Sequence, residues 1–499
     1  MYLAVSAGLN RIVSVRNTVV THDGRYPLRF QTELVCVRTF LTLSRASTQQ
    51  RTFLLYNKLL KKQVCAILYK SMILKNSVIL AFFSAASIVL GIFRDRLLAQ
   101  VVGVGPMLDV YNAAFKIPDL VYGLLLSAVS AATVVPFITK IKDNDDNDLA
   151  SKFNSLFFFF GGALIACSAL AATVVPYFAD RVVPGFDQYQ VNYFITTTRI
   201  LLIQPLFLGL SALIASLAQV RHRFVLYSVA PLFYTLVIIA SIPTLYPRYG
   251  VYGIVWGVVG GAFLSLVIQS YTLYESRIKI RRDLFKWDYV RAHMKVAVPR
   301  SLSTVVSKFR EIIFAAIATS IGIGILSIYL FAQRITDAFV QVVVQSAATA
   351  ALPVLSRTHA RGEHKDYARI LKVNLAFILG ISTCIAGVII VFARDIVHLI
   401  YGPVDNAAAI ATMARYIAWT LPVYALNIYF VSAFNATRDT MVLFYTNFIA
   451  TTLGVIVLYA TASAYGSLAL VFGGWMVSMS YLLILIAFYS RKRRLSSAS

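Results

Sequence analysis

The stretch VYGIVWGVVGGAFLSLVIQSYTL, residues 251–273, contains no charged side chain. A helix needs about 20 predominantly apolar residues to cross the hydrocarbon core of a bilayer, so this run is long enough for one crossing. Residues 275–300, which follow it, carry eight Lys and Arg. An apolar run that ends in a basic segment is typical of a transmembrane helix whose basic flank stays in the cytoplasm.

The rest of the chain repeats this pattern. Of its 499 residues, 59% are apolar and only 13% are charged, whereas about a quarter of the residues in soluble domains are charged. The sequence therefore predicts an all-α polytopic membrane protein. We expect about twelve transmembrane helices, near 76–93, 110–139, 153–177, 193–219, 224–244, 251–273, 296–321, 325–353, 368–392, 408–434, 440–460 and 464–489. The runs 110–139 and 325–353 exceed a simple span and should tilt or bend.

The basic residues indicate the orientation. The net charge of +25 would favour nucleic-acid binding in a soluble protein, but here the bases lie in alternate loops between apolar runs, so no nucleic-acid partner is expected. The basic loops are 140–142, 221–223, 275–300 and 357–372, together with the tail 491–494. The intervening loops 178–192, 245–250, 322–324 and 461–465 are poor in bases. The positive-inside rule then places both termini in the cytoplasm.

Residues 1–71 differ from the rest in composition. They contain eleven Lys and Arg, two acids and no apolar run long enough to span. We expect them to be a basic, disordered extension or translated sequence upstream of a natural start at Met72, and dispensable for transport. An organellar transit peptide is the alternative.

An internal repeat divides the remainder. Residues in the first half recur in the second at an offset of about 217 positions, in the pairs Arg94 and Arg310, Tyr111 and Tyr329, Lys116 and Arg334, Pro136 and Pro353, Arg199 and Arg415, Pro205 and Pro422, and Arg221 and Arg438. Six spans per half predict two six-helix lobes related by a pseudo-twofold axis along the membrane normal. The expected parts are residues 72–274 and 296–490 as lobes, 275–295 as a basic cytoplasmic linker, and 491–499 as a basic tail. Transporters with this plan bind substrate between the halves and alternate access by rocking them.

Several ionisable side chains fall inside the predicted spans. A charge in the hydrocarbon costs at least about 2.5 kcal/mol, so it usually faces a wet cavity and marks function. The candidates are Arg94, Asp95, Asp109, Lys116, Asp119, Arg199, Lys308, Arg310, Glu311, Arg334 and Asp337. Because bases prevail in the seventh and eighth spans, we expect a cationic cavity lined by spans one, two, seven and eight. Its ligand would be an anion, most plausibly a phosphate or pyrophosphate head group.

Nothing in the sequence indicates catalysis. The six His residues and four Cys residues have no metal-ligand spacing, and no Gly-rich phosphate-binding loop is present. We therefore expect a transporter rather than an enzyme, with no cofactor or metal. An ion gradient, the membrane potential or the substrate gradient could each drive transport, and the sequence leaves these alternatives open.

Three motifs carry a family resemblance. Ser87-Ile-Val-Leu-Gly-Ile-Phe-Arg-Asp95 with Ala114-Phe-Lys-Ile-Pro118, Tyr329-Leu-Phe-Ala-Gln-Arg334, and Phe434-Asn-Ala-Thr-Arg-Asp-Thr440 resemble segments of the MurJ (MviN) family. Its members are lipid II flippases of peptidoglycan synthesis in the multidrug/oligosaccharidyl-lipid/polysaccharide exporter superfamily. The resemblance covers about residues 72–490. It implies a cytoplasmic-membrane flippase whose partners are a lipid-linked substrate and membrane lipids.

The resemblance also transfers site residues. Arg94 and Arg334 match family arginines of the central cavity, and Asp109 matches a family aspartate. Ile88 and Tyr122 stand where the family has arginines, and the family usually adds two spans after the twelve. We therefore expect the substrate-binding residues to be Arg94, Asp109, Arg310, Arg334, Lys308 and Lys116, with Arg310 and Lys308 compensating for Ile88 and Tyr122. A flippase for another lipid-linked oligosaccharide and a drug/cation antiporter of the superfamily remain the alternatives.

Overall fold

The helices of this protein follow one another along the chain with short connections. The computed structural model describes residues 79–80, 82–129, 134, 137, 146–221, 223–360, 364–436 and 440–498. The expected extension 1–71, the basic loop 140–142 and Arg438 of the repeat lie outside these residues. The first described helix spans residues 82–97 and continues into the π-helical turn η1 (Leu98–Val102).

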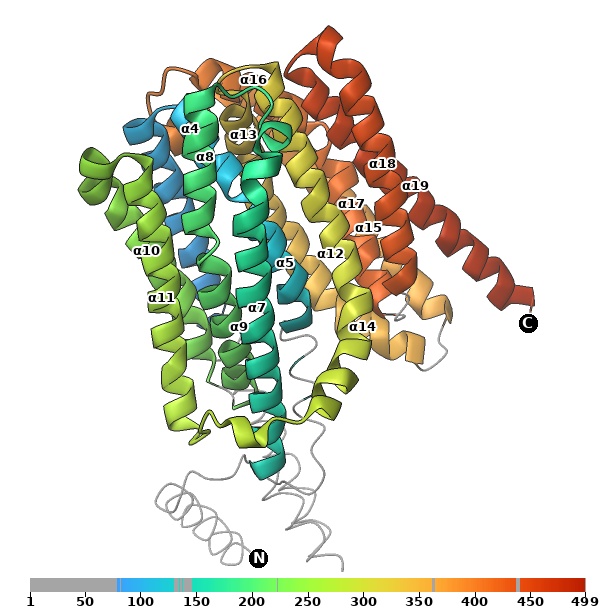
Figure 1. Cartoon of the computed structure of the whole chain (residues 1–499). Coiled ribbons are helices and arrows are strands. Elements are labelled where there is room, and N and C mark those ends of the chain that lie inside the picture. The colour runs from blue at the N-terminus through green and yellow to red at the C-terminus, as the bar shows by residue number, and fades with distance from the viewer. Residues whose placement is uncertain are drawn as a thin grey trace, which may run out of the picture. The chain divides into compact units, whose positions relative to one another are not determined.

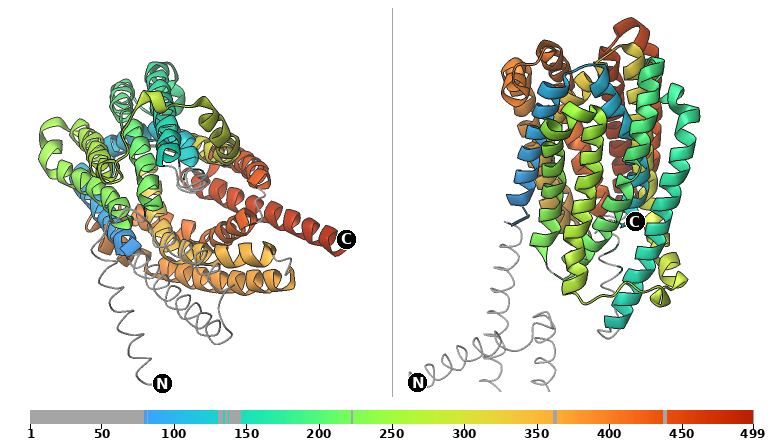
Figure 2. Two further views of the ribbon diagram at one scale, coloured as in Figure 1. Left: turned by 90° about the horizontal axis from the view of Figure 1, so that it is seen from below. Right: turned by 60° about the vertical axis from the view of Figure 1, so that its left-hand side comes forward.

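The remaining elements of the first half are α4 (Pro106–Ala114), α5 (Lys116–Val129), α7 (Asp146–Val182), α8 (Gln188–Leu201), α9 (Gln204–Val220), α10 (Phe224–Tyr249) and α11 (Val251–Glu275). After the short 3-10 turn η2 (Arg282–Leu284), the second half contains α12 (Trp287–Ile321), α13 (Ile325–Phe339), the π-helical turn η3 (Val340–Gln345), α14 (Ser346–Ala360), α15 (His364–Tyr401), α16 (Ala407–Ala418), α17 (Leu421–Ala436), α18 (Thr440–Tyr465) and α19 (Leu468–Ala498). Figure 1 shows these helices running side by side, and in Figure 2 the green helices α8–α11 lie on the opposite side from the orange and red helices α14–α19.

The described helices are consistent with the twelve expected spans. Seven are long and apolar enough to cross a membrane by length and composition, and the bent pair α16–α17 makes eight. The other four predicted spans correspond to residues 82–102, α4–α5, α12 and α13–α14. These four carry all of the candidate ionisable side chains except Arg199, and these side chains lower their apolar character.

The two long runs are not continuous α-helices. Residues 110–129 are divided at Phe115 between α4 and α5, and residues 325–353 contain η3 between α13 and α14. Two further breaks were not predicted. α8 ends and α9 begins next to Pro205, and α16 meets α17 at 53° next to Pro422. Proline disfavours the helical conformation at the preceding residue and lacks an N–H, so it interrupts both repeats at the same place.

Small residues allow the helices of each lobe to approach closely. A Cβ atom at Gly253, Gly257 or Gly261 of α11 would lie 2.5, 2.2 or 2.7 Å from an atom of α10. In the second lobe, a Cβ at Gly454 of α18 would lie 2.1 Å from Val477 of α19. Lipid gives helices no hydrophobic reason to associate, so close backbone packing at small residues supplies much of the attraction. The hairpin α10–α11 consists of the last two helices of the first half of the chain, and α18–α19 consists of the last two helices of the second half.

Candidate functional site: a charged cavity between the lobes

A cavity of about 980 Å³ lies between the two halves of the chain. Its lining includes Arg94 and Leu98 together with residues of α4, α5, α12 and α13, as predicted from the charges. The prediction was incomplete, because residues of α9, α10, α14, α16, α17, α18 and α19 also contribute. One face of α17 supplies Tyr424, Asn427, Ile428 and Val431, which are spaced by three or four residues.

Four of the six predicted binding residues line this cavity. Arg94 and Lys116 come from the first half of the chain, and Arg310 and Arg334 come from the second half. Asp109 and Lys308 are not among the lining residues, and neither are Ile88 and Tyr122. Asp109 and Lys308 thus lie beside the lining and not in it, and their contacts are described below.

The cavity is less cationic than the sequence suggested. Asp119, Glu311 and Asp337 line it together with the four basic residues, so the lining has one more cation than carboxylates. Helical spacing explains this difference. Asp337 lies three residues after Arg334, so these two side chains share one face of α13. Glu311 lies next to Arg310, about 100° around α12, and both still line the cavity.

Asp95 joins two of the arginines across the lobes. The Arg94 guanidinium donates to Asp95 Oδ1 through Nε at 3.0 Å and Nη2 at 2.9 Å. Arg334 Nη1 of α13 lies 2.5 Å from the same oxygen. Asp95 is only 5% exposed. One buried carboxylate thus balances one of two guanidinium charges, and the second remains available for an anionic ligand.

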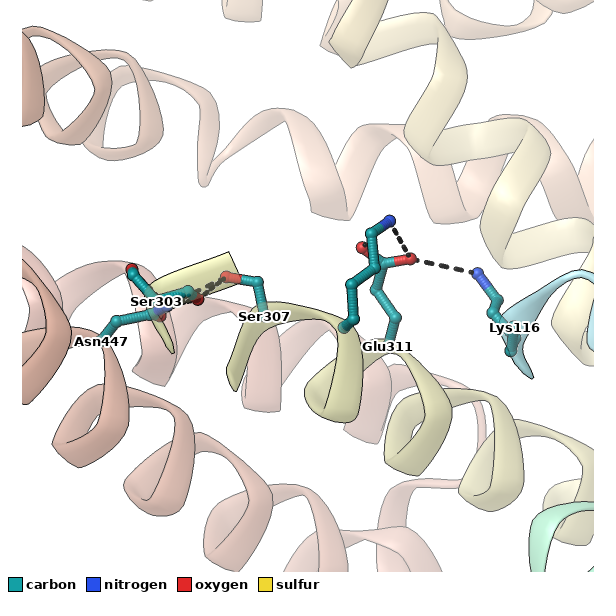
Figure 3. Close-up of polar contacts among 6 residues, drawn as sticks. Lys116, Ser303, Ser307, Glu311 and Asn447 are labelled. Atoms are coloured by element: carbon teal, nitrogen blue, oxygen red, sulfur yellow. Dashed lines mark hydrogen bonds and ion pairs between the residues drawn. The ribbon is translucent and has the colours of Figure 1, made fainter. Parts of the chain in front are cut away.

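Glu311 makes a second connection between the lobes. Its carboxylate lies 3.7 Å from Lys116 Nζ of α5, and it accepts from Lys308 Nζ at 2.9 Å. Figure 3 shows Lys116 and Glu311 pointing toward each other from their two helices. Lys308 packs against α5, since its Cγ would lie 3.2 Å from a Cβ at Gly123. These contacts explain why Lys308 does not reach the cavity lining.

Asp109 forms a cap that crosses the lobe boundary. It lies in the first turn of α4 and is 1% exposed. Its carboxylate accepts from Gly324 N at 2.6 Å, Ser327 N at 2.8 Å and Ser327 Oγ at 2.6 Å, at the start of α13. Gly324 has φ +81°, a conformation that glycine adopts readily. A carboxylate at a helix N-terminus satisfies free N–H groups and interacts favourably with the helix dipole.

Further interlobe hydrogen bonds lie at the same end of the molecule, called here the closed end and defined by residues 103–105, 322–324 and 402–406. Asn112 Nδ2 donates to Ser327 Oγ at 3.0 Å, and Asn406 Nδ2 donates to the Val104 carbonyl at 2.9 Å. Gln100 Nε2 donates to the Tyr401 carbonyl at 3.1 Å. In this conformation the lobes are therefore joined beyond the cavity on the side away from the basic loops.

A group of uncharged polar residues was missed by the sequence reasoning. Asn447 Nδ2 of α18 donates to Ser307 Oγ at 2.9 Å and to the Ser303 carbonyl at 2.9 Å. Figure 3 shows this contact on the same helix as Glu311. All three residues line the cavity. The spacing of Ser303, Ser307 and Glu311 by four residues was the signal that could have identified this face.

The described residues contain no group of three or more His, Cys, Asp or Glu side chains placed to hold a metal ion. The lining of the cavity provides Arg and Lys donors, carboxylates and neutral polar groups. Such a site can bind and release an anion across the lobe boundary.

Comparison with known proteins agrees with this geometry. The model of the family described as "Lipid II flippase MurJ" matches residues 98–499. A probable lipid II flippase MurJ of Rhizobium meliloti (strain 1021) is 24% identical over 70% of this chain and 68% of its own. A lipid II flippase MurJ of Burkholderia cenocepacia is 23% identical over 67% of each chain.

Solved structures show the same fold. A lipid II flippase MurJ in an inward closed conformation superposes with a TM-score of 0.69, at 18% identity, over 82% of this chain and 87% of that one. An inward-facing multidrug resistance MATE family transporter superposes with a TM-score of 0.66, at 15% identity, over 83% of this chain and 95% of that one. The fold is thus common to both transporter types, but the sequence match over residues 98–499 shows that this chain belongs to the MurJ family of lipid II flippases.

Proposed function

We propose that this protein moves lipid II, a polyprenyl-pyrophosphate-linked sugar precursor, across the cytoplasmic membrane for peptidoglycan synthesis. It is a multi-pass membrane transporter and not an enzyme. The observation that carries the proposal is the family match over residues 98–499. The cavity supports it, because arginines from both lobes line one space large enough for a polar head group.

The pyrophosphate would bind to the arginines. A guanidinium presents paired N–H donors that match phosphate oxygens, and a charge-assisted pair of this kind is about twice as strong as a neutral hydrogen bond. Arg94 and Arg334 already converge on Asp95, and Arg310 lines the same cavity from α12. Two or more cations are needed, because a lone cation would leave part of the buried anionic charge uncompensated.

Binding can be linked to lobe movement through Asp95. The Arg334–Asp95 ion pair crosses from the second half to the first. A pyrophosphate competes with the Asp95 carboxylate for the same guanidinium donors, so substrate binding weakens a direct bond between the lobes. The substrate would therefore bind with different affinity to the conformation with the Arg334–Asp95 bond and to the one without it. Alternating access requires such a difference.

The orientation follows from the loop charges. We place both termini and the basic loops in the cytoplasm. The closed end would then face the opposite side of the membrane, and the conformation described would receive substrate from the cytoplasmic side. The membrane potential or a coupling ion would supply the direction of transport, and no described feature selects between them.

The test of this function is complementation in a walled bacterium depleted of its own lipid II flippase. The wild-type chain should restore growth, and direct flipping should be measured with a fluorescent lipid II analogue in vesicles. A flippase for another lipid-linked oligosaccharide is the second candidate, since Ile88 and Tyr122 replace family arginines. Transport of that lipid without transport of lipid II would favour the second candidate.

A pair of variants tests the site itself. Arg310→Ala should abolish transport at normal membrane levels, because it removes a cavity cation. Lys308→Ala is the matched control two residues away, and it should reduce transport less, because Lys308 does not line the cavity and its charge is paired with Glu311. Normal transport by Arg310→Ala would show that the cavity serves a less charged ligand and that Arg310 does not compensate for Ile88 and Tyr122.

A further inference from the structure

A second cavity, of about 570 Å³, lies on the outside of the helix bundle where the two lobes meet. We call it the seam groove. Its lining includes Ile313 and Ala316 of α12, Ile456, Tyr459 and Ala460 of α18, and Arg181 of α7. The groove is thus apolar with one cation, and it brings together one helix of the first half and two of the second, which lie close to one another in Figure 1.

The seam groove is separate from the central cavity. Phe314 and Ala315 of α12 line the central cavity, whereas Ile313 and Ala316 line the groove. Residues two positions apart on a helix point about 200° apart, so α12 forms a wall with a different space on each side. On the groove side, Ile456 is 58% exposed and Tyr459 is 79% exposed. Apolar side chains that remain exposed on membrane-spanning helices face lipid, so the seam groove opens to the hydrocarbon.

Arg181 is positioned against the second lobe by a close backbone contact. It lies in the last turn of α7, toward the closed end. Four residues later, a Cβ at Gly185 would lie 1.8 Å from the Thr319 carbonyl oxygen of α12, so only glycine fits there. The Arg181 guanidinium lies 5.5 Å from the centre of the Phe178 ring, and within the described ranges no carboxylate forms an ion pair with it. Its charge is therefore available to a ligand.

We propose that the seam groove binds an anionic phospholipid, with an acyl chain along α12 and α18 and the phosphate on Arg181. Charge complementarity selects the occupant, because a neutral hydrocarbon would need no cation beside the groove. The substrate itself is the less favoured occupant. Its phosphates would be held in the central cavity, with the whole of α12 between them and Arg181. A phospholipid that contacts Arg181 of one lobe and α12 and α18 of the other would stabilise the conformation joined at the closed end.

The test uses the purified full-length chain in detergent, titrated with phosphatidylglycerol or phosphatidylcholine and analysed by native mass spectrometry and thermal unfolding. Phosphatidylglycerol should be retained and should raise the unfolding temperature, and phosphatidylcholine should not. Arg181→Gln should weaken phosphatidylglycerol binding about fivefold, the effect of one basic residue on an anionic lipid. Arg248→Gln is the matched control, because Arg248 also lies exposed in the last turn of a helix, α10, without lining the groove.

A second variant tests the apolar part. Ala460→Phe should fill the groove and reduce phosphatidylglycerol retention, while Ala166→Phe on an exposed position of α7 should leave it unchanged. Equal weakening by Arg181→Gln and Arg248→Gln would overturn the proposal, since it would reflect surface charge in general. Full retention by Ala460→Phe would overturn it as well. If undecaprenyl phosphate displaces phosphatidylglycerol from the wild-type chain, and Ala460→Phe prevents undecaprenyl phosphate from binding, the groove would be assigned to the substrate's tail instead. None of these outcomes depends on whether the protein flips lipid II.

Discussion

Asp109→Asn should open the closed end. The carboxylate accepts three hydrogen bonds from the start of α13, two at Oδ1 from Ser327 and one at Oδ2 from Gly324 N. An asparagine side chain keeps one carbonyl oxygen for Ser327 but turns an NH₂ group toward Gly324 N. One buried N–H then loses its acceptor, and the helix dipole loses its counter-charge. An unsatisfied buried donor costs about 1–3 kcal/mol, so we expect a loss of about 2 kcal/mol.

The loss of stability affects only the conformation in which the lobes are joined at the closed end. When the lobes separate, water can satisfy both side chains, so the substitution should shift the equilibrium toward the open arrangement by about thirtyfold. Spin labels at Tyr189 and Ile323 would report it. These residues are exposed and belong to the first and second halves. The native cysteines would be replaced, and the distance distribution measured by pulsed electron resonance should gain a longer component.

Asp187→Asn is the matched control. Asp187 caps α8 by accepting from Gln190 N at 2.8 Å, which is the same chemistry within one lobe. It should leave the distance between the labels unchanged. An unchanged distribution in Asp109→Asn, or an equal shift in Asp187→Asn, would refute the assignment of Asp109 as an interlobe cap.

Three other perturbations test separate features. Glu311→Gln should release Lys116 and raise the affinity for a pyrophosphate lipid by up to about fivefold, since a partly exposed ion pair is worth up to about 1 kcal/mol; unchanged binding in native mass spectrometry would count against Glu311 as the competing charge. Gly257→Ala should lower the unfolding temperature, because its Cβ would lie 2.2 Å from Ser241 Oγ and overpacking costs about 1–3 kcal/mol. Gly260→Ala should have little effect, because its nearest contact would be at 3.9 Å; equal unfolding temperatures would contradict this account of α10–α11 packing. Deletion of residues 1–71 should preserve complementation, and loss of function at normal membrane levels would contradict their dispensability.

Hydropathy was sufficient to predict the class of protein and the approximate positions of the spans. Apolar runs such as residues 251–273 could only be transmembrane spans, because the backbone must satisfy its own hydrogen bonds in lipid. The repeat and the charges inside the spans also predicted a charged space between the two halves of the chain, and Arg94, Lys116, Arg310 and Arg334 line the cavity that the structure contains. These inferences were accessible because hydropathy and charge are local properties of the chain.

The pairing of the charges could not be predicted from the sequence, because it depends on how the helices pack. Whether Asp109 faces a cavity or caps α13 depends on the position of residues more than two hundred places along the chain, which no local pattern records. The same holds for Lys308, whose partner Glu311 is local but whose direction is set by packing against Gly123 of α5. The near balance of cations and carboxylates in the cavity arises because each helix turns particular side chains inward. Contacts between helices, such as that of Gly123 of α5 with Lys308 of α12, set this rotation, and a sequence read along one dimension does not contain it.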